Sequence, residues 1–299
     1  MKKTLALLLA IALIATLSAC SSLSVFQKAI TVTDDMGREV SLPKAALRIV
    51  SLAPANTEFL FALGLGDKIV GVTDWCNFPQ EVSSKEKVGG FSKPSVEKIV
   101  SLKPDLVVAA SLHKDVVEQL EILKIPVIVL NAKSISEVLA NADLLGKVTG
   151  ATKAANDVKS RINAILKQVD DKVKTLSAEQ RPVVYYEVWH DPIMTAGPNT
   201  FINELITRAG GINLAASAPT NYPTYSLEEL LARQPEVMFY GHAVETVEQV
   251  LARTNWKSIP AISNERVYLV NEDIILRAGP RIGEGLLELA KHLHPGLWK

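Results

Sequence analysis

The sequence contains the same helix-then-strand module twice, and this repeat constrains the fold more than any other feature. The stretch SVEKIVSLKPDLVV at 95–108 returns 131 positions later as SLEELLARQPEVMF at 226–239. Three identities keep their places: Ser95, Glu97 and Pro104 recur as Ser226, Glu228 and Pro235. A chain of 299 residues has room for two domains of ordinary size. We therefore expect two similar lobes, each containing this module.

A second, fainter match follows the same order along the chain. NTEFLFALGLGDKIVG, from Asn56, pairs with NTFINELITRAGGINLA, from Asn199, at an offset of 143. Both stretches predict a helix that Asn-Thr opens and glycine ends. Generic helix signals alone produce likenesses of this kind. Two matches in the same order nevertheless favour a repeated lobe.

Short aliphatic strands alternate with amphipathic helices around these modules. The predicted strands are RIVSL (48–52), KIVGV (68–72), DLVVAA (105–110), PVIVL (126–130) and VVYYEV (183–188). Helices are predicted near 55–63 and 114–123. Continuous apolar strands that alternate with helices indicate a parallel sheet covered on both faces. The predicted fold class is α/β, with two Rossmann-like lobes built on parallel sheets.

A long helical pattern separates the two halves. It breaks at Gly150–Thr152, and the following TKAANDVKSRINAILKQVDDKVKTL contains neither proline nor glycine. A helix of about 25 residues extends about 37 Å, which is too long for a crossover in a small α/β unit. It is suited to bridging two lobes. We assign 48–150 to an N-terminal lobe, 151–178 to an inter-lobe backbone helix and 179–299 to a C-terminal lobe.

The N-terminus resembles an export signal and not a part of the fold. Lys2 and Lys3 precede an apolar run from Thr4 to Leu17, which is too short to span a bilayer. Leu17-Ser18-Ala19-Cys20 resembles the bacterial lipobox, in which cleavage leaves a lipid-modified cysteine as the new N-terminus; an ordinary signal peptide is the alternative. We expect a signal peptide at 1–19, and a lipidated Cys20, tether and hairpin (ITVTDDMGREVSLP) within 20–47. The protein is then extracytoplasmic, anchored to the cell membrane through its lipid alone.

Composition excludes some classes of protein. The formal net charge is zero, so no basic field is available to hold a nucleic-acid backbone. Cys76 is the single cysteine besides Cys20, which leaves no internal disulfide and predicts a buried thiol packed as a small hydrophobe. No G-x-S-x-G, G-x-x-x-x-G-K-[ST] or H-E-x-x-H motif is present, and we expect no enzyme. His292-x-His294 lies at a helix end, where cations favour the helix dipole, so we expect no metal site there.

Aromatic side chains gather in segments without regular periodicity. Trp75 and Phe78 lie in TDWCNFPQ, Phe91 in GGFSKP, Trp189 in EVWHDP, and Tyr222 and Tyr225 in TNYPTY. Such loops follow strands, at the rim where open α/β sheets bind ligands. Rings from both lobes suggest a cleft lined by flat apolar faces. The alternative is that each ring fills the core beneath its own loop.

The repeated glutamates occupy equivalent helix positions. Ser95 and Ser226 are good N-caps, which places Glu97 and Glu228 in the first turn, at N2. A carboxylate there stabilises the helix by about 0.3–1 kcal/mol through the helix dipole, and this alone accounts for each glutamate. Their agreement in both lobes also suits a partner that is a two-fold dimer.

The chain resembles a known family, the extracytoplasmic substrate-binding proteins of ABC importers for metal chelates such as cobalamin, haem and iron siderophores. The resemblance covers about 30–295. It rests on RIVSLAPANTEFLFALG, IVGVTDWCNFP, VEKIVSLKPDLVVA, LKIPVIVLNAKSISEV and LRAGPRIGEGL, and its cobalamin-binding members match best. It implies two lobes joined by one long helix, a ligand in the cleft between them, and Glu97 and Glu228 docked onto arginines of a permease dimer with its ATPase subunits.

The same resemblance implies the ligand site of a monomeric protein without a resident cofactor. Ten positions are implicated: Pro54, Ala55, Asn56, Trp75, Phe91, Trp189, Met194, Tyr222, Asp273 and Arg277. Rings would bracket a cobalt corrinoid, and Asp273 and Arg277 would hydrogen-bond its amide-rich edge. Ala110 and Met194 stand where the cobalamin-binding members have aromatic side chains. Asp273 and Arg277 have an alternative role, in which they pair with each other or cap the last helix.

Other ligands remain open at this point. Haem needs an axial ligand, for which Tyr222, Tyr225, His190 and His242 are candidates. A ferric siderophore favours several arginines, and the candidate loops offer little besides Arg277. An enzyme or a metal-ion receptor on the same scaffold needs a catalytic or ligand cluster that the spacing does not provide. A single rigid connecting helix predicts small lobe closure on binding, checked by radius of gyration in solution scattering.

Overall fold

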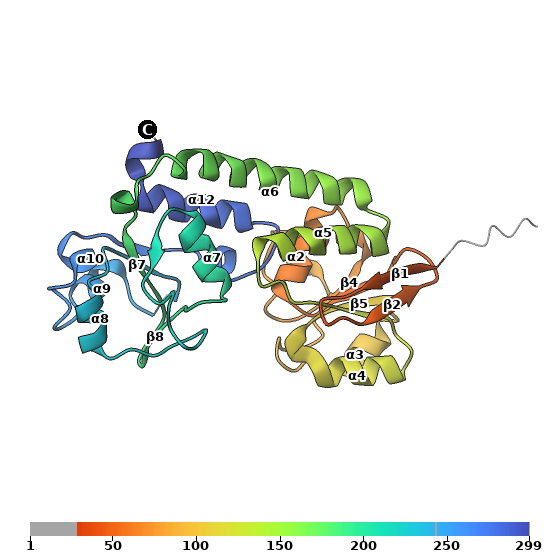
Figure 1. Ribbon diagram of the computed structural model, residues 1–299. Coiled ribbons are helices and arrows are strands. Elements are labelled where there is room, and N and C mark those ends of the chain that lie inside the picture. The colour runs from red at the N-terminus through yellow and green to blue at the C-terminus, as the bar shows by residue number, and fades with distance from the viewer. Residues whose placement is uncertain (1–28, 243, 299) are drawn as a thin grey trace, which may run out of the picture.

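The computed structural model describes residues 29–242 and 244–298, so the predicted signal peptide and Cys20 lie outside the described residues. Two α/β lobes lie side by side beneath one long helix, α6 (Thr152–Val173), which reaches across both (Figure 1). No helix in the two described ranges has the length and apolarity needed to cross a membrane.

The N-terminal lobe is built on four parallel strands in the order β4-β3-β5-β6. The strands are β3 (Ile49–Ser51), β4 (Ile69–Val72), β5 (Leu106–Ala110) and β6 (Val127–Leu130). The helices are α2 (Pro54–Ala62), α3 (Val96–Ser101), α4 (Lys114–Ile122) and α5 (Ile135–Thr149), with 3₁₀ turns η1 (Gly66–Lys68), η2 (Gln80–Ser84) and η3 (Ser111–His113). The predicted hairpin is β1 (Ile30–Thr33) paired antiparallel with β2 (Glu39–Leu42).

The C-terminal lobe repeats this sheet. Its strands are β7 (Val183–His190), β8 (Ile193–Thr195), β9 (Ile212–Asn213), β10 (Val237–Tyr240) and β11 (Val267–Leu269). Parallel pairing gives the order β9-β7-β10-β11, which matches β4-β3-β5-β6 strand for strand. The addition is β8, which pairs antiparallel with the end of β7. The predicted parallel sheets and the predicted lobe repeat are therefore confirmed.

Short helices surround the second sheet. They are α7 (Phe201–Arg208), α8 (Leu227–Arg233), α9 (Val247–Leu251), α10 (Pro260–Ser263), α11 (Glu272–Ile275) and α12 (Ile282–Leu293), with 3₁₀ turns η4 (Ala178–Gln180) and η5 (Pro295–Trp298). The repeated sequence module forms α3 followed by β5 in one lobe and α8 followed by β10 in the other. Both helices thus precede the strand that pairs with the first strand of their own sheet.

The fainter sequence match was wrong about helix position in the first lobe. Asn199 and Thr200 do open α7, where the Thr200 side chain accepts a hydrogen bond from the Asn203 amide. Asn56 instead lies inside α2, which begins at Pro54. Proline fixes its own φ near the helical value and lacks the amide that the first turn leaves unpaired, so it begins the helix two residues earlier.

Helix α6 joins the lobes through a shared core. Its buried residues recur at helical spacing: Ala155, Val158, Ile162, Leu166, Val169 and Val173. They belong to one hydrophobic cluster that includes residues of both lobes, and α6 packs against α5 on one side of the molecule and α12 on the other. The helix begins after Gly150, which has a φ of 73°, and ends at Val173 instead of at 178 as predicted. Ser177 and Gln180 instead cap the separate turn η4.

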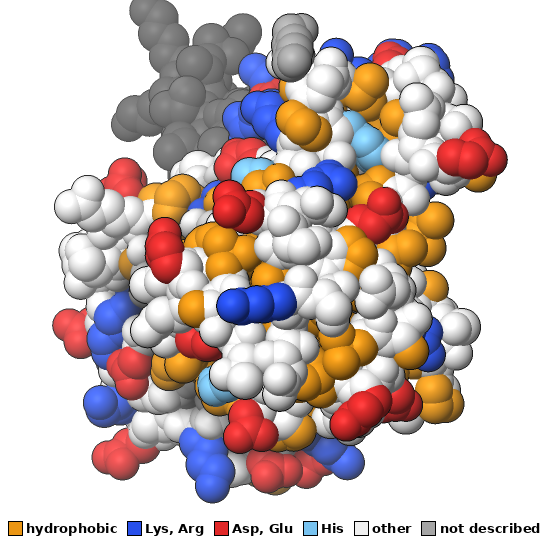
Figure 2. Space-filling model, turned by 90° about the vertical axis from the view of Figure 1, so that its left-hand side faces the viewer, with side chains coloured by type: hydrophobic (Ala, Val, Ile, Leu, Met, Phe, Trp, Pro, Cys, Tyr) orange, Lys and Arg blue, Asp and Glu red, His pale blue; other side chains and the backbone are white. Residues whose placement is uncertain are grey.

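The outer face of the C-terminal lobe carries charges of both signs (Figure 2). Acidic and basic side chains alternate over it, with apolar side chains between them. The described side chains on that face do not form the continuous basic surface that a nucleic-acid backbone requires.

Candidate functional site

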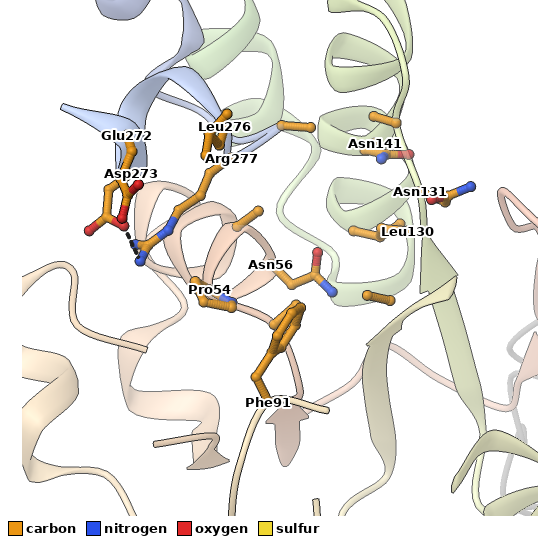
Figure 3. A pocket seen from close by; sticks show the side chains of 15 residues that line it. Pro54, Asn56, Phe91, Leu130, Asn131, Asn141, Glu272, Asp273, Leu276 and Arg277 are labelled. Atoms are coloured by element: carbon orange, nitrogen blue, oxygen red, sulfur yellow. Dashed lines mark ion pairs between the residues drawn. The ribbon is translucent and has the colours of Figure 1, made fainter. Parts of the chain in front are cut away.

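A cavity of about 400 Å³ lies between the two lobes (Figure 3). The N-terminal lobe contributes residues that follow the carboxyl ends of β3, β5 and β6, and the C-terminal lobe contributes the segment 272–278. Carboxyl ends of parallel strands are where open α/β sheets bind ligands. We call this cavity the cleft.

Six of the ten predicted ligand residues line the cleft: Pro54, Ala55, Asn56, Phe91, Asp273 and Arg277. The first four come from the N-terminal lobe, and the last two from the C-terminal lobe. Asn56 is buried, and its Nδ2 donates a 2.9 Å hydrogen bond to the carbonyl of Ala109. This bond ties the start of α2 to β5 and holds one wall of the cleft.

The other four predicted residues do not line this cavity. Trp75 is 67% exposed, in the loop that precedes Asn77. Trp189 and Met194 lie on the paired strands β7 and β8, and Tyr222 is exposed in the segment before α8. Trp75, Trp189 and Tyr222 leave flat apolar surface uncovered, as a ligand larger than the cleft would require.

His113 holds Phe91 and Ala110 in place. Its Nδ1 accepts a 3.0 Å hydrogen bond from the Ala110 amide, and its Nε2 lies 2.6 Å from the Phe91 carbonyl oxygen. Since a carbonyl only accepts, Nε2 carries the proton and the ring is neutral. The Phe91 ring also meets the imidazole edge to face at 5.5 Å. Two cleft residues therefore depend on one buried histidine.

This arrangement predicts sensitivity to acid. Burial lowers the pKa of His113, while the hydrogen bond to Phe91 opposes that change only in part. The unfolded chain then binds the proton more readily than the folded chain, so the free energy of unfolding falls as pH decreases below about 6.5. A His113→Gln variant should reduce this slope by up to about 1.4 kcal/mol per pH unit in denaturant titrations at several pH values.

The matched comparison is His292→Gln, because burial lowers the pKa of His292 as well. Both variants should flatten the pH dependence of stability, whereas His113→Gln alone should weaken ligand binding. Equal binding by the two variants would show that His113 does not position the cleft.

Asp273 and Arg277 belong to an inter-lobe network with Glu58, Asn77 and Arg281. Arg277 Nη2 lies 2.6 Å from Asp273 Oδ1, which realises the pairing left open by the sequence. Arg277 Nη1 also donates to Glu58 Oε1 at 2.8 Å and to Asn77 Oδ1 at 2.7 Å. Arg281 donates to both Glu58 oxygens at 2.7 Å. One buried carboxylate of the first lobe is thus held by two arginines of the second.

Sequence reasoning missed several cleft residues. Asn131, Asn141, Glu272 and Leu276 also line the cavity. Asn141 is 2% exposed, and its Oδ1 is buried without a hydrogen-bond partner among the described residues. An asparagine among the apolar positions of the helix at 135–149 was the available signal. Such an unpaired group costs about 1–3 kcal/mol, which a ligand with amide groups would recover.

The haem-ligand candidates of the C-terminal lobe form a separate cluster. The rings of His190 and His242 are 5.5 Å apart, and Trp189 packs against both. Their Nδ1 atoms are buried and unpaired among the described residues. His242 Nε2 lies 2.9 Å from Glu187, a buried carboxylate that Arg253 holds with two bonds. The hydroxyl of Tyr225 is also buried and unpaired in the described part of the chain, whereas Tyr222 is exposed.

The repeated glutamates occupy N2 in both helices, as predicted. Ser95 caps α3 by accepting from the Lys98 amide, and Ser226 caps α8 by accepting from the Glu229 amide. Both Glu97 and Glu228 are exposed. Figure 1 places α3 and α8 on the side of the molecule opposite α6, one in each lobe. The two carboxylates are therefore available to a partner that covers this side.

The remaining predicted features are local. Cys76 is buried, as predicted, and its Sγ receives a hydrogen bond from Thr57. His292 stacks on Tyr268, and His294 contacts the Gly210 carbonyl. In residues 29–242 and 244–298, no three His, Cys, Asp or Glu side chains gather in the way that a metal ion needs.

Comparison with known proteins gives one family and consistent relatives. The family described as periplasmic binding protein matches residues 49–274. The chain is 38% identical to the uncharacterised ABC transporter substrate-binding lipoprotein YvrC of Bacillus subtilis, over 90% of this chain and 87% of that one. It is 30% identical to the vitamin B12-binding protein of Vibrio campbellii, over 83% and 89%. A solved periplasmic haem-binding protein, RhuT of Roseiflexus sp. RS-1, superposes with a TM-score of 0.75 at 25% identity, over 85% and 100%.

Proposed function

Because this chain belongs to the periplasmic binding protein family, we propose that the solute it captures is a corrinoid, a cobalt macrocycle with an amide-rich edge. Proteins of this kind bind solutes and are not enzymes; they serve ABC importers, in which a permease and ATPase subunits move the solute across the membrane. The ligand, the lipid anchor at Cys20 and the monomeric state are our proposals.

The chemistry of the cleft supports a corrinoid. Phe91 offers a ring face from one side, and three asparagines (Asn56, Asn131 and Asn141) supply carboxamides around it. The unpaired carboxamide of Asn141 complements the amide groups of a corrin edge, which both donate and accept. Asp273 remains one-third exposed and has lone pairs free for a ligand N–H. The observation that carries this proposal is the meeting of six predicted ligand residues at one inter-lobe cavity.

The size of the cleft assigns a role to the exposed aromatic side chains. Cavities of about 300–1,000 Å³ hold drug-sized ligands, and a corrinoid is larger than these. The cleft, at about 400 Å³, therefore takes only a part of the macrocycle. Trp75, Trp189 and Tyr222 would cover the parts of the ring that extend beyond it.

Haem is the second candidate, and one observation favours it. His190 and His242 each have a buried, unpaired Nδ1 atom beside Trp189, among the described residues. If His242 donates its Nε2–H to Glu187, its Nδ1 is left as a lone-pair donor, as in metal-binding imidazoles whose other nitrogen donates to a carboxylate. Coordination of haem iron would produce a shift of the Soret band.

The test is a titration of the soluble chain that starts at Ser21. Cyanocobalamin, cobinamide and haemin are followed by calorimetry and absorbance. We expect sub-micromolar corrinoid binding, weakened at least about tenfold by Phe91→Ala and by Asn141→Leu. Asn141→Leu should leave stability equal or higher, because it replaces an unpaired polar group with an apolar one of similar volume.

Asn163→Leu is the matched control, since Asn163 is exposed on α6, far from the cleft lining. It should bind corrinoid as the unaltered chain does. A Soret shift with haemin and no corrinoid signal would transfer the ligand assignment to haem. Full corrinoid affinity in Asn141→Leu would remove Asn141 from the ligand site.

We further propose that Glu97 and Glu228 dock onto the permease dimer. Reversing both charges, Glu97→Lys with Glu228→Lys, should reduce permease affinity at least about tenfold and abolish transport, because two exposed carboxylates would become like charges to the permease arginines. Ligand affinity should not change. Uptake by intact cells and pull-down with the permease complex give the two readouts.

Glu248→Lys is a close control for this experiment. Glu248 is also exposed at N2 of a capped helix, α9 in the C-terminal lobe, so its reversal carries the same dipole penalty. If the double variant and this control support equal transport, the docking assignment fails.

A further inference from the structure

A second cavity lies beside the cleft in the N-terminal lobe. It has a volume of about 260 Å³ and is enclosed by the β1–β2 turn, η3, the first turns of α4 and the end of β6. We call it the side pocket and define it by Met36, Ala110, Ser111, Lys114, Val117 and Val129. Its volume is below the range for a separate drug-sized ligand, so it is suited to a substituent of something larger.

The side pocket and the cleft adjoin at one residue. Ala110 lines both cavities. Next to it, Ser111 Oγ donates a 2.8 Å hydrogen bond to Asn131 Oδ1, and Asn131 faces the cleft. The consecutive β6 residues Val129 and Leu130 line the side pocket and the cleft respectively, so the two spaces lie on opposite faces of the sheet. They meet at the carboxyl end of the sheet, at Ala110, the last residue of β5.

The lining of the side pocket is apolar apart from Ser111 and four charged residues, Arg38, Lys114, Glu118 and Glu121. Met36, Val117 and Val129 supply thioether and aliphatic surface suited to a planar ring. The Arg38 guanidinium is already held by Asp34 and, at 2.6 Å, by Glu121. The Lys114 ammonium is 81% exposed, and its nearest carboxylate, of Glu118, is 3.9 Å away. The pocket therefore suits a planar base joined to the rest of the ligand through an anionic group.

We propose that the side pocket binds the nucleotide portion of a corrinoid, with the base against Met36, Val117 and Val129 and the phosphodiester at Lys114. This inference rests on the corrinoid function proposed above and adds a part of the ligand to it. Ala110 is then the specificity-determining residue, because its small side chain leaves room for the ligand to extend from the cleft over the carboxyl end of the sheet into the side pocket. A large side chain at 110 would obstruct this route and would also narrow the cleft.

The experiment compares cyanocobalamin with dicyanocobinamide, which lacks the nucleotide. Calorimetry is done on the unaltered chain and on Ala110→Trp, Lys114→Ala and Leu112→Trp. Leu112 is 47% exposed on the same 3₁₀ turn and lines neither cavity, so Leu112→Trp controls for the added bulk. Thermal unfolding is measured for each variant, which separates a binding effect from misfolding.

We expect the unaltered chain to prefer cyanocobalamin over dicyanocobinamide by at least about tenfold. Ala110→Trp should bring this ratio near one, and it should weaken both corrinoids to some extent because Ala110 also lines the cleft. Lys114→Ala should weaken the binding of cyanocobalamin and not that of dicyanocobinamide. It should also reduce the salt dependence of cyanocobalamin binding, because an ammonium–phosphate contact is lost. Leu112→Trp should behave as the unaltered chain.

Failure of the side-pocket assignment can be distinguished from failure of the proposed corrinoid function. Equal affinity of the unaltered chain for the two corrinoids, or an unchanged ratio in both Ala110→Trp and Lys114→Ala, would overturn the side-pocket assignment and leave the corrinoid function standing. Absence of binding by both corrinoids would overturn the proposed function itself, and the side-pocket assignment with it.

Discussion

Replacing Glu58 with alanine should lower the free energy of unfolding by about 3–5 kcal/mol, because it leaves Arg281 without its counter-ion and Arg277 with Asp273 alone in a largely buried site. The Glu58 side chain is 1% exposed, and those of Arg277 and Arg281 are 14% and 15% exposed. The carboxylate is also a main contact between the lobes. Its loss should therefore widen the distribution of lobe positions as well as destabilise the fold.

Denaturant unfolding and solution scattering measure these two effects. Glu58→Gln keeps the side-chain volume and provides a variant that folds if alanine does not; it should fall between alanine and the unaltered chain. Asp157→Ala on the exposed face of α6 is the control, and surface substitutions of that kind usually change stability by less than about 0.5 kcal/mol. A loss of less than 1 kcal/mol in Glu58→Ala would show that the arginines find other partners, most directly Asp273 and Asn77.

Replacing Glu187 with alanine should lower the free energy of unfolding by a similar amount, about 3–5 kcal/mol, because it removes a buried carboxylate of the C-terminal lobe. The Glu187 side chain is fully buried and accepts two bonds from Arg253 at 2.6 and 2.7 Å. It also lies 2.9 Å from His242 Nε2 and accepts a longer bond from the Tyr185 hydroxyl. Arg253 keeps Glu245 as a partner, so part of its charge remains compensated.

A double-mutant cycle isolates this pair. Glu187→Leu with Arg253→Met replaces both ions with apolar groups, and the pair of changes should cost less than the sum of the two single changes. Chemical denaturation of the four proteins provides the coupling free energy. Additive losses would mean that Glu187 acts chiefly through His242, and the haem titration would then show which of these variants alters the Soret band.

Local chemistry could be predicted from the sequence, and contacts between distant residues could not. Glu97 and Glu228 were placed at N2 because a serine N-cap and the residues of the first turn are neighbours in the chain. Pro54 moved the start of α2 for an equally local reason. The sequence around Glu58, in contrast, indicates only an exposed charge in a helix. Its burial depends on Arg277 and Arg281, which belong to the other lobe.

The same distinction applies to the candidate site. Pro54 and Asn56 were implied by the family resemblance, and Phe91 was implied both by that resemblance and by its place in a loop without regular periodicity. Asn141 and His113 belong to helical segments whose orientation toward the cleft depends on packing, so neither was predicted. Trp75 and Tyr222 were predicted as a set of loop aromatics, and a sequence does not reveal whether such rings line the cavity or stand outside it.

The inter-lobe network also sets an order of events during synthesis. Glu58 and Arg277 are 219 residues apart in the chain, and Arg281 is still later. At translation rates of about 5–20 residues per second, Glu58 precedes its first arginine by about 10–45 s. During this interval Glu58 has neither of its arginine partners, and the contacts that form later close one of the longest loops in the molecule.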